Sequence, residues 1–327
     1  MSHSYKLPLV DMHLPQYGTA AAMDAVEKDM WRWLEGHRLI GNEAKRERLV
    51  RTRPQYTTAL YFPYADEDRL IVINRFMALA FLVDDIDDEH GVHDDDAVSE
   101  FCENLIAIAY RTRAPSSGVE RAVAEVMGDL SAGRSSAWHD ALNESFAQWL
   151  RTYPVEVRLA RLGEAMPFQE YVPHRRYSVG EIGFLHMHEY VQGIDLPAHV
   201  RNLPAMTEAR NRASEWIGLY NDVYSLEKEE AVGYPHNAVL VVRRQRGRGT
   251  QDAVDVVNGI LSGLLDQFEA ACHAIPGQVR AVVDDSCIVD DAMRIVDGYR
   301  QILRGNFDYH IGTPRYLTGY VQLQQVS

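Results

Sequence analysis

Apolar residues recur at helical spacing along most of this chain, and that periodicity constrains it to a largely helical fold. Within residues 20–39, Met23, Val26, Met30 and Leu34 fall on one face of a predicted helix. Glycines and prolines separate further segments of this kind, and strand-like runs are few. The predicted helices cover residues 68–88, 96–111, 119–130, 137–153, 180–192, 207–231, 235–246, 252–274 and 278–305. We therefore predict an all-α protein, a single domain over residues 1–327 whose helical bundle can hold a cavity.

Net charge limits what such a bundle can bind. The 327 residues include 33 Lys and Arg against 47 Asp and Glu, so the formal net charge is −14. A chain this acidic is a poor general binder of nucleic acid and of anionic membranes, and we predict no nucleic-acid partner. An anionic substrate would need a local source of positive charge, which a bound divalent metal can supply.

Cysteine usage and hydropathy bear on the compartment. Cys102, Cys272 and Cys287 are scattered, which argues against a disulfide framework and a thiolate zinc site. Residues 1–10 lack the apolar core of a signal peptide, and no apolar run reaches the roughly 18 residues of a membrane span. We expect a cytoplasmic protein without stable membrane insertion.

The first candidate metal site lies where an apolar helix turns abruptly acidic. Residues 81–89 read F-L-V-D-D-I-D-D-E, and Asp84 and Asp88 are four residues apart, on one helical face. Crowded carboxylates at a helix C-terminus repel each other and the helix dipole, and a hard divalent cation would compensate. A solvated acidic loop is the other interpretation of this cluster.

The second candidate site combines different oxygen donors. Residues 221–229 read N-D-V-Y-S-L-E-K-E, so Asn221, Ser225 and Glu229 recur every four residues. On a helix they form one stripe of amide, hydroxyl and carboxylate oxygens, all of them suited to magnesium. Lys228, beside the last of these, can reach an anion that the metal holds.

Together the two segments resemble the aspartate-rich motif and the N-D-x-x-S-x-x-K-E motif of bacterial class I terpene synthases. Arg175 lies 221 − 175 = 46 residues before Asn221, where the family has its diphosphate-sensing arginine. Arg315 and Tyr316 resemble the family's terminal R-Y pair. Residues 236–239, H-N-A-V, match a further family signature, and the resemblance covers about residues 61–316.

This resemblance implies a fold, an activity and a cofactor. The fold would be the class I terpenoid synthase helical bundle with a central active-site cavity. The activity would be Mg²⁺-dependent ionisation of a linear isoprenyl diphosphate, followed by cyclisation of the carbocation. Three Mg²⁺ ions would bridge the diphosphate, held by Asp84 and Asp88 on one side and by Asn221, Ser225 and Glu229 on the other.

The resemblance also implies roles for residues around the substrate. Diphosphate oxygens would be bound by Arg175, Lys228, Arg315 and the Tyr316 hydroxyl. Ser178 would link Arg175 to Val179, whose carbonyl faces the substrate. Our candidates for stabilising the carbocation are Phe81 and Tyr309, whose rings can attract a cation. For Tyr61, Phe62, Phe184 and Trp216, core packing is the favoured interpretation.

Departures from the family pattern leave substrate length open. The family often has a tryptophan shortly before the aspartates and another before the R-Y pair, where this chain has Leu79, Ala80 and Tyr309. Less bulk indicates a wider cavity and favours geranylgeranyl over farnesyl diphosphate, although the shorter substrate is commoner in the family. Many relatives form dimers, so a homodimer is one alternative for the oligomeric state.

Two rival functions stay open at this point. A chain-elongating prenyltransferase shares fold and substrates, but it normally carries two aspartate-rich motifs, and here the Asn221 motif replaces the second. A head-to-head prenyl synthase is disfavoured for the same reason. A non-catalytic isoprenoid- or metal-binding helical protein has no need for the complete set of metal, arginine, lysine and R-Y residues.

Overall fold

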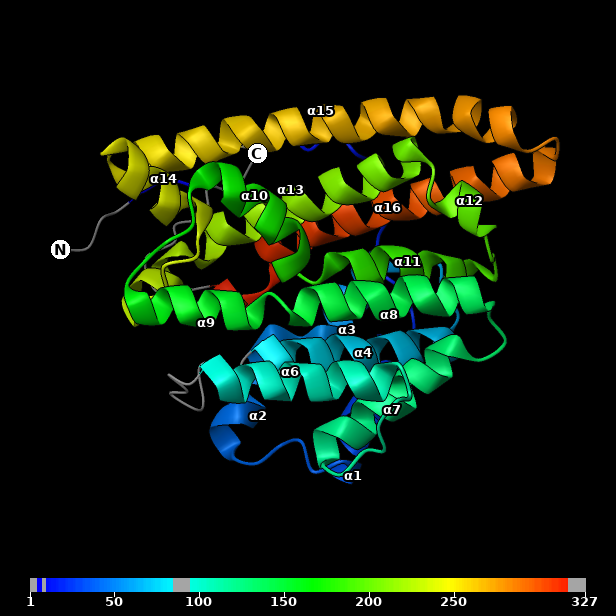
Figure 1. Ribbon diagram of the computed structural model, residues 1–327, viewed down its shortest axis with the longest axis horizontal. Helices are drawn as coiled ribbons and strands as arrows, with labels where there is room; N and C mark the ends of the chain where they lie inside the picture. Colours follow the sequence, from blue (N-terminus) through cyan, green and yellow to red (C-terminus); the bar gives the residue numbers. More distant parts are fainter. Residues whose placement is uncertain (1–4, 8–9, 85–94, 317–327) are drawn as a thin grey trace.

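The computed structural model describes residues 5–7, 10–84 and 95–316. The described residues form helices and no strands, which confirms the all-α prediction (Figure 1). The helices are α1 (Met23–Gly36), α2 (Glu43–Thr52), α3 (Pro54–Tyr61), α4 (Glu67–Asp84), α6 (Asp95–Ala109), α7 (Gly118–Ser131), α8 (Ser136–Leu150), α9 (Tyr153–Leu162), α10 (Phe168–Ser178), α11 (Glu181–Gln192), α12 (Ala198–Arg201), α13 (Pro204–Val232), α14 (Ala238–Arg246), α15 (Thr250–Val282), α16 (Ser286–Gly312) and the 3₁₀ helix η1 (Pro314–Tyr316).

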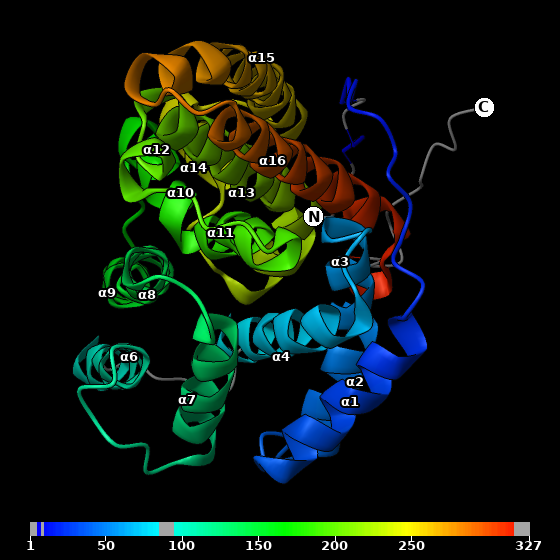
Figure 2. The ribbon, with the colours of Figure 1, turned by 90° about the vertical axis from the view of Figure 1, so that its right-hand side faces the viewer.

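Helix α13 is the element around which the site is built. Its 29 residues begin at Pro204, whose missing N–H costs nothing in a first turn, and end at Val232, followed by Gly233 in a left-handed conformation. Apolar side chains bury most of its length against α15, which lies along it, and α10 and α16 pack on its other sides (Figures 1 and 2). A helix that is buried nearly all round gives its polar stripe a fixed position.

The other wall of the site comes from the N-terminal half of the chain. Helix α4 packs against α1, α3 and α7, and α3 packs closely against α16. Figure 2 shows α4 crossing the lower part of the molecule while α13, α15 and α16 lie above it. Motifs more than a hundred residues apart in the sequence therefore face a common interior.

Several predicted helix boundaries were wrong. Pro276 does not end a helix, because α15 continues through it to Val282, and the last long helix begins at Ser286 instead of residue 278. Packing of α15 on α13, α14 and α16 outweighs the hydrogen bond that Pro276 removes. The helices that the periodicity missed, α2, α3, α9, α10 and α12, are short.

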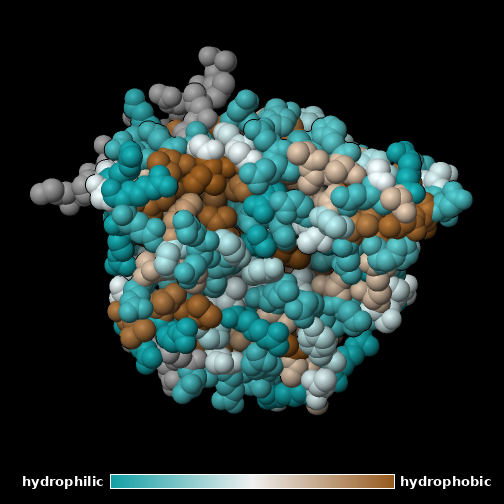
Figure 3. Space-filling view, turned by 45° about the horizontal axis from the view of Figure 1, so that its top comes forward, coloured by the Kyte–Doolittle hydropathy of each residue, from teal (hydrophilic) through white to brown (hydrophobic). Residues whose placement is uncertain are grey.

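The visible surface is mainly hydrophilic. Figure 3 shows one face on which hydrophilic side chains predominate and apolar patches are separate from one another. Within the described residues, no helix combines the length and the apolar character needed to span a membrane.

Candidate active site

One cavity gathers the predicted site residues. Its walls come from α3, α4, α8, α10, α11, α13, α16 and η1, and it is lined by Phe81, Asp84, Arg175, Ser178, Val179, Asn221, Ser225, Lys228, Glu229, Tyr309 and Arg315. Of the remaining predicted residues, Asp88 lies outside the described part of the chain. For Tyr316 the structure describes only the main chain, in η1. The structure therefore brings together every predicted side chain that it describes.

The oxygen-donor stripe lies along α13 as the four-residue spacing predicts. Asn221, Ser225 and Glu229 all line the cavity, and Ser225 is buried. Burial, with the Asp222 carboxylate nearby, raises the pKa of Glu229 above its ordinary value, while a hydrogen bond from Asn237 acts the other way. A buried carboxylate of this kind favours a cation beside it.

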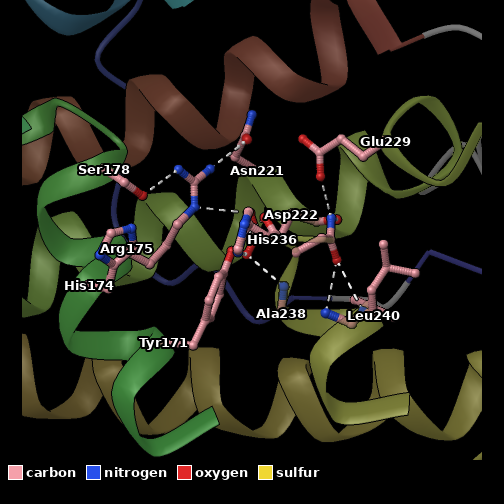
Figure 4. A network of polar contacts seen from close by, with 12 residues as sticks. Tyr171, His174, Arg175, Ser178, Asn221, Asp222, Glu229, His236, Ala238 and Leu240 are labelled. Carbon is pink, nitrogen blue, oxygen red and sulfur yellow. Dashed lines mark hydrogen bonds and ion pairs between the residues drawn. The ribbon is translucent and has the colours of Figure 1, made fainter. Parts of the chain in front are cut away.

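Asp222 is the hub of the polar network next to this stripe, and sequence reasoning assigned it no role. Its Oδ1 accepts a hydrogen bond from Arg175 Nε at 3.0 Å. Its Oδ2 accepts from the Tyr171 hydroxyl at 2.6 Å and from the Ala238 backbone N–H at 2.9 Å (Figure 4). One fully buried carboxylate thereby joins α10, α13 and the start of α14.

Asn237 explains part of the H-N-A-V signature. Its amide nitrogen donates to Glu229 Oε2 at 2.8 Å and to the Asp222 carbonyl at 2.6 Å. Its amide oxygen accepts from the backbone N–H of Val239 at 2.9 Å, which caps α14. A capping residue thus also orients the last carboxylate of the stripe.

The amide of Asn221 is oriented from two sides. Its Oδ1 accepts a hydrogen bond from Arg175 Nη2 at 2.9 Å, and its Nδ2 lies 3.2 Å from His310 Nε2. The other ring nitrogen of His310 lies 2.9 Å from the Asn306 carbonyl, which can only accept, so Nδ1 carries the proton and Nε2 accepts. Burial lowers the pKa of His310 to about 3, which keeps the ring neutral.

Arg175 fits against α13 because residue 218 is a glycine. A Cβ atom at Gly218 would lie 2.7 Å from Arg175 Cγ, closer than real Cβ contacts. Burial opposes the charge of the guanidinium, but Asp222 beside it raises the pKa of Arg175 above its ordinary value. The arginine therefore stays charged at the edge of the cavity.

The turn between α10 and α11 lies directly after this arginine. Arg175 Nη1 donates to Ser178 Oγ at 3.3 Å, and Val179 follows at the C-terminal end of α10. Gly180 has a φ of +76° and separates α10 from α11. Carbonyl groups in the last turn of a helix lack intrahelical donors and carry partial negative charge, so this end of α10 suits a developing cation.

The C-terminal arginine and the first aspartate meet across the cavity. Arg315 Nη2 lies 3.6 Å from Asp84 Oδ2, and its Nη1 donates to Thr52 Oγ1 at 2.8 Å. The Arg315 guanidinium also lies over the Phe81 ring, 4.8 Å from its centre, in a cation–π arrangement. Phe81 thus lines the cavity with one ring face close to a protein cation.

The remaining lining is largely aromatic. Tyr309 donates its hydroxyl to the Thr52 carbonyl at 2.7 Å, which fixes the position of its ring in the wall. Trp149 of α8 joins Phe76 and Phe184 in the same wall. A largely aromatic wall shelters the interior of the cavity from bulk water.

The donor set fits a hard divalent metal. Within the described ranges no group of three or more His, Cys, Asp or Glu side chains could hold a metal ion by itself. The α13 stripe instead mixes amide, hydroxyl and carboxylate oxygens, and the acidic run that begins at Asp84 continues into residues 85–88, beyond the described part of α4. Such oxygens suit Mg²⁺, and burial, which raises the pKa of Glu229, favours a cation beside its carboxylate.

Sequence reasoning missed residues whose role depends on distant contacts. Asp222 lay within the motif, but its bonds to Tyr171 and Ala238 cross between helices. His310 and Glu181 carry no motif of their own. An acidic residue directly after Val179 and Gly180 was the available signal for Glu181.

Comparison with known proteins agrees with this arrangement. Residues 75–267 match the family model described as terpene synthase family 2, C-terminal metal binding. The chain is 32% identical to (2Z,6E)-hedycaryol synthase of Kitasatospora setae over 92% of this chain and 89% of that one. It is 27% identical to the 7-epi-alpha-eudesmol synthase, (2E,6E)-farnesyl diphosphate cyclizing, of Streptomyces viridochromogenes, over 87% and 85% of the two chains.

A solved structure shares the fold over nearly the whole chain. Hedycaryol synthase in complex with HEPES superposes with a TM-score of 0.84 at 27% identity, covering 94% of this chain and 99% of that one. The family match, the two relatives and this structural similarity lead to one conclusion: the chain belongs to the terpene synthase family, enzymes of the lyase class, and has the all-helical class I fold.

Proposed function

We propose that the protein is a magnesium-dependent sesquiterpene cyclase, which ionises farnesyl diphosphate, cyclises the carbocation and releases diphosphate. The observation that carries this proposal is the meeting of three kinds of side chain in one cavity. The α13 stripe offers hard oxygen ligands, Arg175, Lys228 and Arg315 offer positive charge, and the aromatic wall offers shelter from water. Ionisation of an allylic diphosphate needs all three.

The metal ligands follow from the fit of the donors. Three Mg²⁺ ions would be held by Asp84 and Asp88 across the cavity from Asn221, Ser225 and Glu229. When bound, the metal neutralises charge on the diphosphate oxygens and so assists cleavage of the carbon–oxygen bond.

Diphosphate recognition belongs to the cationic side chains. Arg175, Lys228, Arg315 and the Tyr316 hydroxyl would bind its oxygens, and Arg175 would couple that binding through Ser178 to the Val179 carbonyl. The 3.3 Å contact between Arg175 and Ser178 supports this link. At the end of α10, the Val179 carbonyl would stabilise the cation that forms as diphosphate leaves.

The cavity wall favours the shorter substrate. The missing tryptophans indicated a wider cavity, but Trp149 of α8 supplies a large ring to the same lining, with Phe76 and Phe184 beside it. The eudesmol synthase relative is described as cyclising farnesyl diphosphate. The names of both relatives are those of terpene alcohols, and we extend this to the present protein as a cascade that ends with water.

A substrate series tests the proposal. The purified protein is incubated with Mg²⁺ and, separately, geranyl, farnesyl and geranylgeranyl diphosphate, and solvent extracts are analysed by gas chromatography and mass spectrometry. We expect cyclic C15 products from farnesyl diphosphate, and none after addition of a chelator. A cyclic product from geranylgeranyl diphosphate alone would overturn the proposed chain length while keeping the enzyme class.

Two further results would overturn the cyclase itself. Longer diphosphates that form when isopentenyl diphosphate is added, without any terpene, would identify a chain-elongating prenyltransferase. Absence of turnover with every substrate, together with retained diphosphate binding, would identify a non-catalytic isoprenoid-binding protein.

A further inference from the structure

We propose that Glu181, Tyr61 and Asn306 hold the water molecule that quenches the final carbocation, so that these residues determine the ratio of alcohol to hydrocarbon in the product. The inference rests on the proposed cyclase function and deepens it. All three side chains line the cavity, each is more than nine-tenths buried, and none belongs to the metal or diphosphate groups described above.

The three residues form a short hydrogen-bonded chain from three different helices. Asn306 Nδ2 of α16 donates to the Tyr61 hydroxyl at 2.7 Å. The Tyr61 hydroxyl, at the end of α3, donates in turn to Glu181 Oε1 at 2.9 Å, on the first residue of α11. This chain puts a polar group into a wall that Phe76 and Phe184 otherwise make apolar.

The close approach of α16 to α3 makes this contact. A Cβ atom at Gly305 would lie 2.6 Å from the Leu60 carbonyl oxygen, so only glycine lets the two helices come this near. The next residue on each helix is Asn306 and Tyr61, respectively. Their contact is therefore built into the packing of the bundle.

Two polar atoms of the chain are left for a ligand. Glu181 Oε2 and Asn306 Oδ1 are buried, and neither has a hydrogen-bond partner within the described part of the structure. Leaving such atoms unpaired is costly, and a water molecule with two or more polar partners is the usual remedy. A water between a carboxyl and an amide meets that requirement at the wall where a carbocation would pass.

The protonation of Glu181 sets how the water is held. Burial raises the pKa of Glu181 to about 8, against the opposing effects of the Tyr61 hydrogen bond and the Arg175 charge, so the carboxyl is protonated at neutral pH. Because Oε1 accepts from Tyr61, the proton lies on Oε2, which donates to the water oxygen. One water hydrogen is donated to Asn306 Oδ1, and the second lone pair of the water faces the cavity.

The quenching step balances without any further reagent than water. The free lone pair forms a carbon–oxygen bond to the cationic carbon, and a protonated alcohol results. This oxonium loses one proton to the released diphosphate, the base that the proposed reaction itself produces in the cavity. Glu181 keeps its proton throughout and acts by positioning the water.

A matched set of variants tests the inference. Glu181→Gln keeps a donor at the position of Oε2, whereas Glu181→Met removes both polar atoms at similar size; Asn306→Leu and Tyr61→Phe remove the other partners. Each variant is turned over with farnesyl diphosphate in H₂¹⁸O, and labelled alcohol is measured as a share of total terpene. Tyr299→Phe is the control, because it removes a buried hydroxyl of α16 that bonds to Arg210 and does not line the cavity.

We expect the wild type to form ¹⁸O-labelled alcohol, and Glu181→Gln and Tyr299→Phe to keep its share. In Glu181→Met and Asn306→Leu the share should fall about tenfold in favour of hydrocarbon, the scale of one lost hydrogen bond. If Glu181→Met does not fold, the alcohol share of Asn306→Leu and of Tyr61→Phe still tests the inference, because each removes one member of the hydrogen-bonded chain. An unchanged share in these variants, or a wild type that forms hydrocarbon only, would overturn the inference alone; no terpene at all would overturn the proposed function with it.

Discussion

At the scale of single residues, the site depends on side chains that hold other side chains in position. The Asn221 amide can turn its oxygen toward a metal only if its nitrogen has a partner, and the neutral His310 ring provides one. Residues that hydrogen-bond to a metal ligand in this way typically contribute about ten- to a hundredfold to metal affinity or activity. His310 is thus a positioning residue in this account.

Replacing this histidine should weaken metal binding. In His310→Phe the ring volume stays, but Asn221 loses its acceptor, and we expect the Mg²⁺ concentration for half-maximal turnover to rise by about tenfold. His273→Phe is the control, because His273 on α15 makes the same bond to a carbonyl four residues earlier, at the surface. Equal Mg²⁺ requirements in the two variants would contradict this role.

Burial of Glu181 should also be visible in stability. Its pKa of about 8 lies above the ordinary value of 4.5, so between these pH values the folded state binds more protons than the unfolded state. The contribution of this group to the free energy of unfolding therefore falls as pH rises, by up to about 1.4 kcal/mol per pH unit. Glutamine does not titrate, so the free energy of unfolding of Glu181→Gln, measured with urea, should rise relative to that of the wild type from pH 5 to 8. Parallel pH profiles of the two proteins would contradict the burial of this carboxyl.

The sequence was informative about residues that belong to a helical repeat. The four-residue spacing predicted that Asn221, Ser225 and Glu229 share a face, and all three line one cavity. It could not predict Asp222 as a hub, because the donors that reach it come from two other helices, α10 and α14. The catalytic roles of Asn221, Ser225 and Glu229 stay predictions that only activity measurements can test.

At the scale of elements, the site depends on how closely α10 approaches α13. Gly218 admits the Arg175 side chain, and the arginine then contacts Asp222 and Asn221 on the same helix. Positioning errors near 1 Å can cost a large factor in rate. The packing of this helix pair is thus part of the catalytic geometry.

Adding one methyl group at this contact should impair turnover. Gly218→Ala places a Cβ atom 2.7 Å from Arg175 Cγ, and we expect kcat to fall by about ten- to a hundredfold as the guanidinium is displaced. Gly263→Ala on α15 is the matched control, since no atom lies within 4 Å of its new Cβ atom, and alanine there should leave kcat unchanged. Wild-type kcat in Gly218→Ala would show that the contact is not needed.

Long elements were easier to predict than their ends. Periodicity identified α4, α13 and α15, because each buries a continuous apolar face. It placed a break at Pro276 that the structure lacks, since local propensity is weaker than the packing of α15 along α13. Helices such as α12, with 4 residues, are too short to show a period at all.

At the scale of the whole molecule, a chain of net charge −14 is proposed to bind a highly charged anion. The general field repels such a ligand, so the metal and a few cations must outweigh it locally. The fold class followed from sequence because helical periodicity pervades the chain. A single domain over residues 1–327 and a homodimer stay predictions, because no sequence motif determines domain organisation or oligomeric state.

Removal of metal should therefore abolish most diphosphate affinity. Titration calorimetry with inorganic diphosphate should show binding at least about a hundredfold tighter with Mg²⁺ than with a chelator, a difference of about 2.7 kcal/mol. Ca²⁺ at the same concentration controls for ionic strength, and its larger radius should restore binding less well. Equal affinity with and without Mg²⁺ would show that the cationic side chains suffice.

The most direct test of the central claim is the rate of terpene formation from farnesyl diphosphate in the wild type and in Asn221→Ala, each with Mg²⁺ and with a chelator. The account predicts a cyclic C15 product from the wild type with Mg²⁺, none with the chelator, and a loss of at least about a hundredfold in Asn221→Ala. A wild-type rate that is unaffected by the chelator and by Asn221→Ala would contradict it.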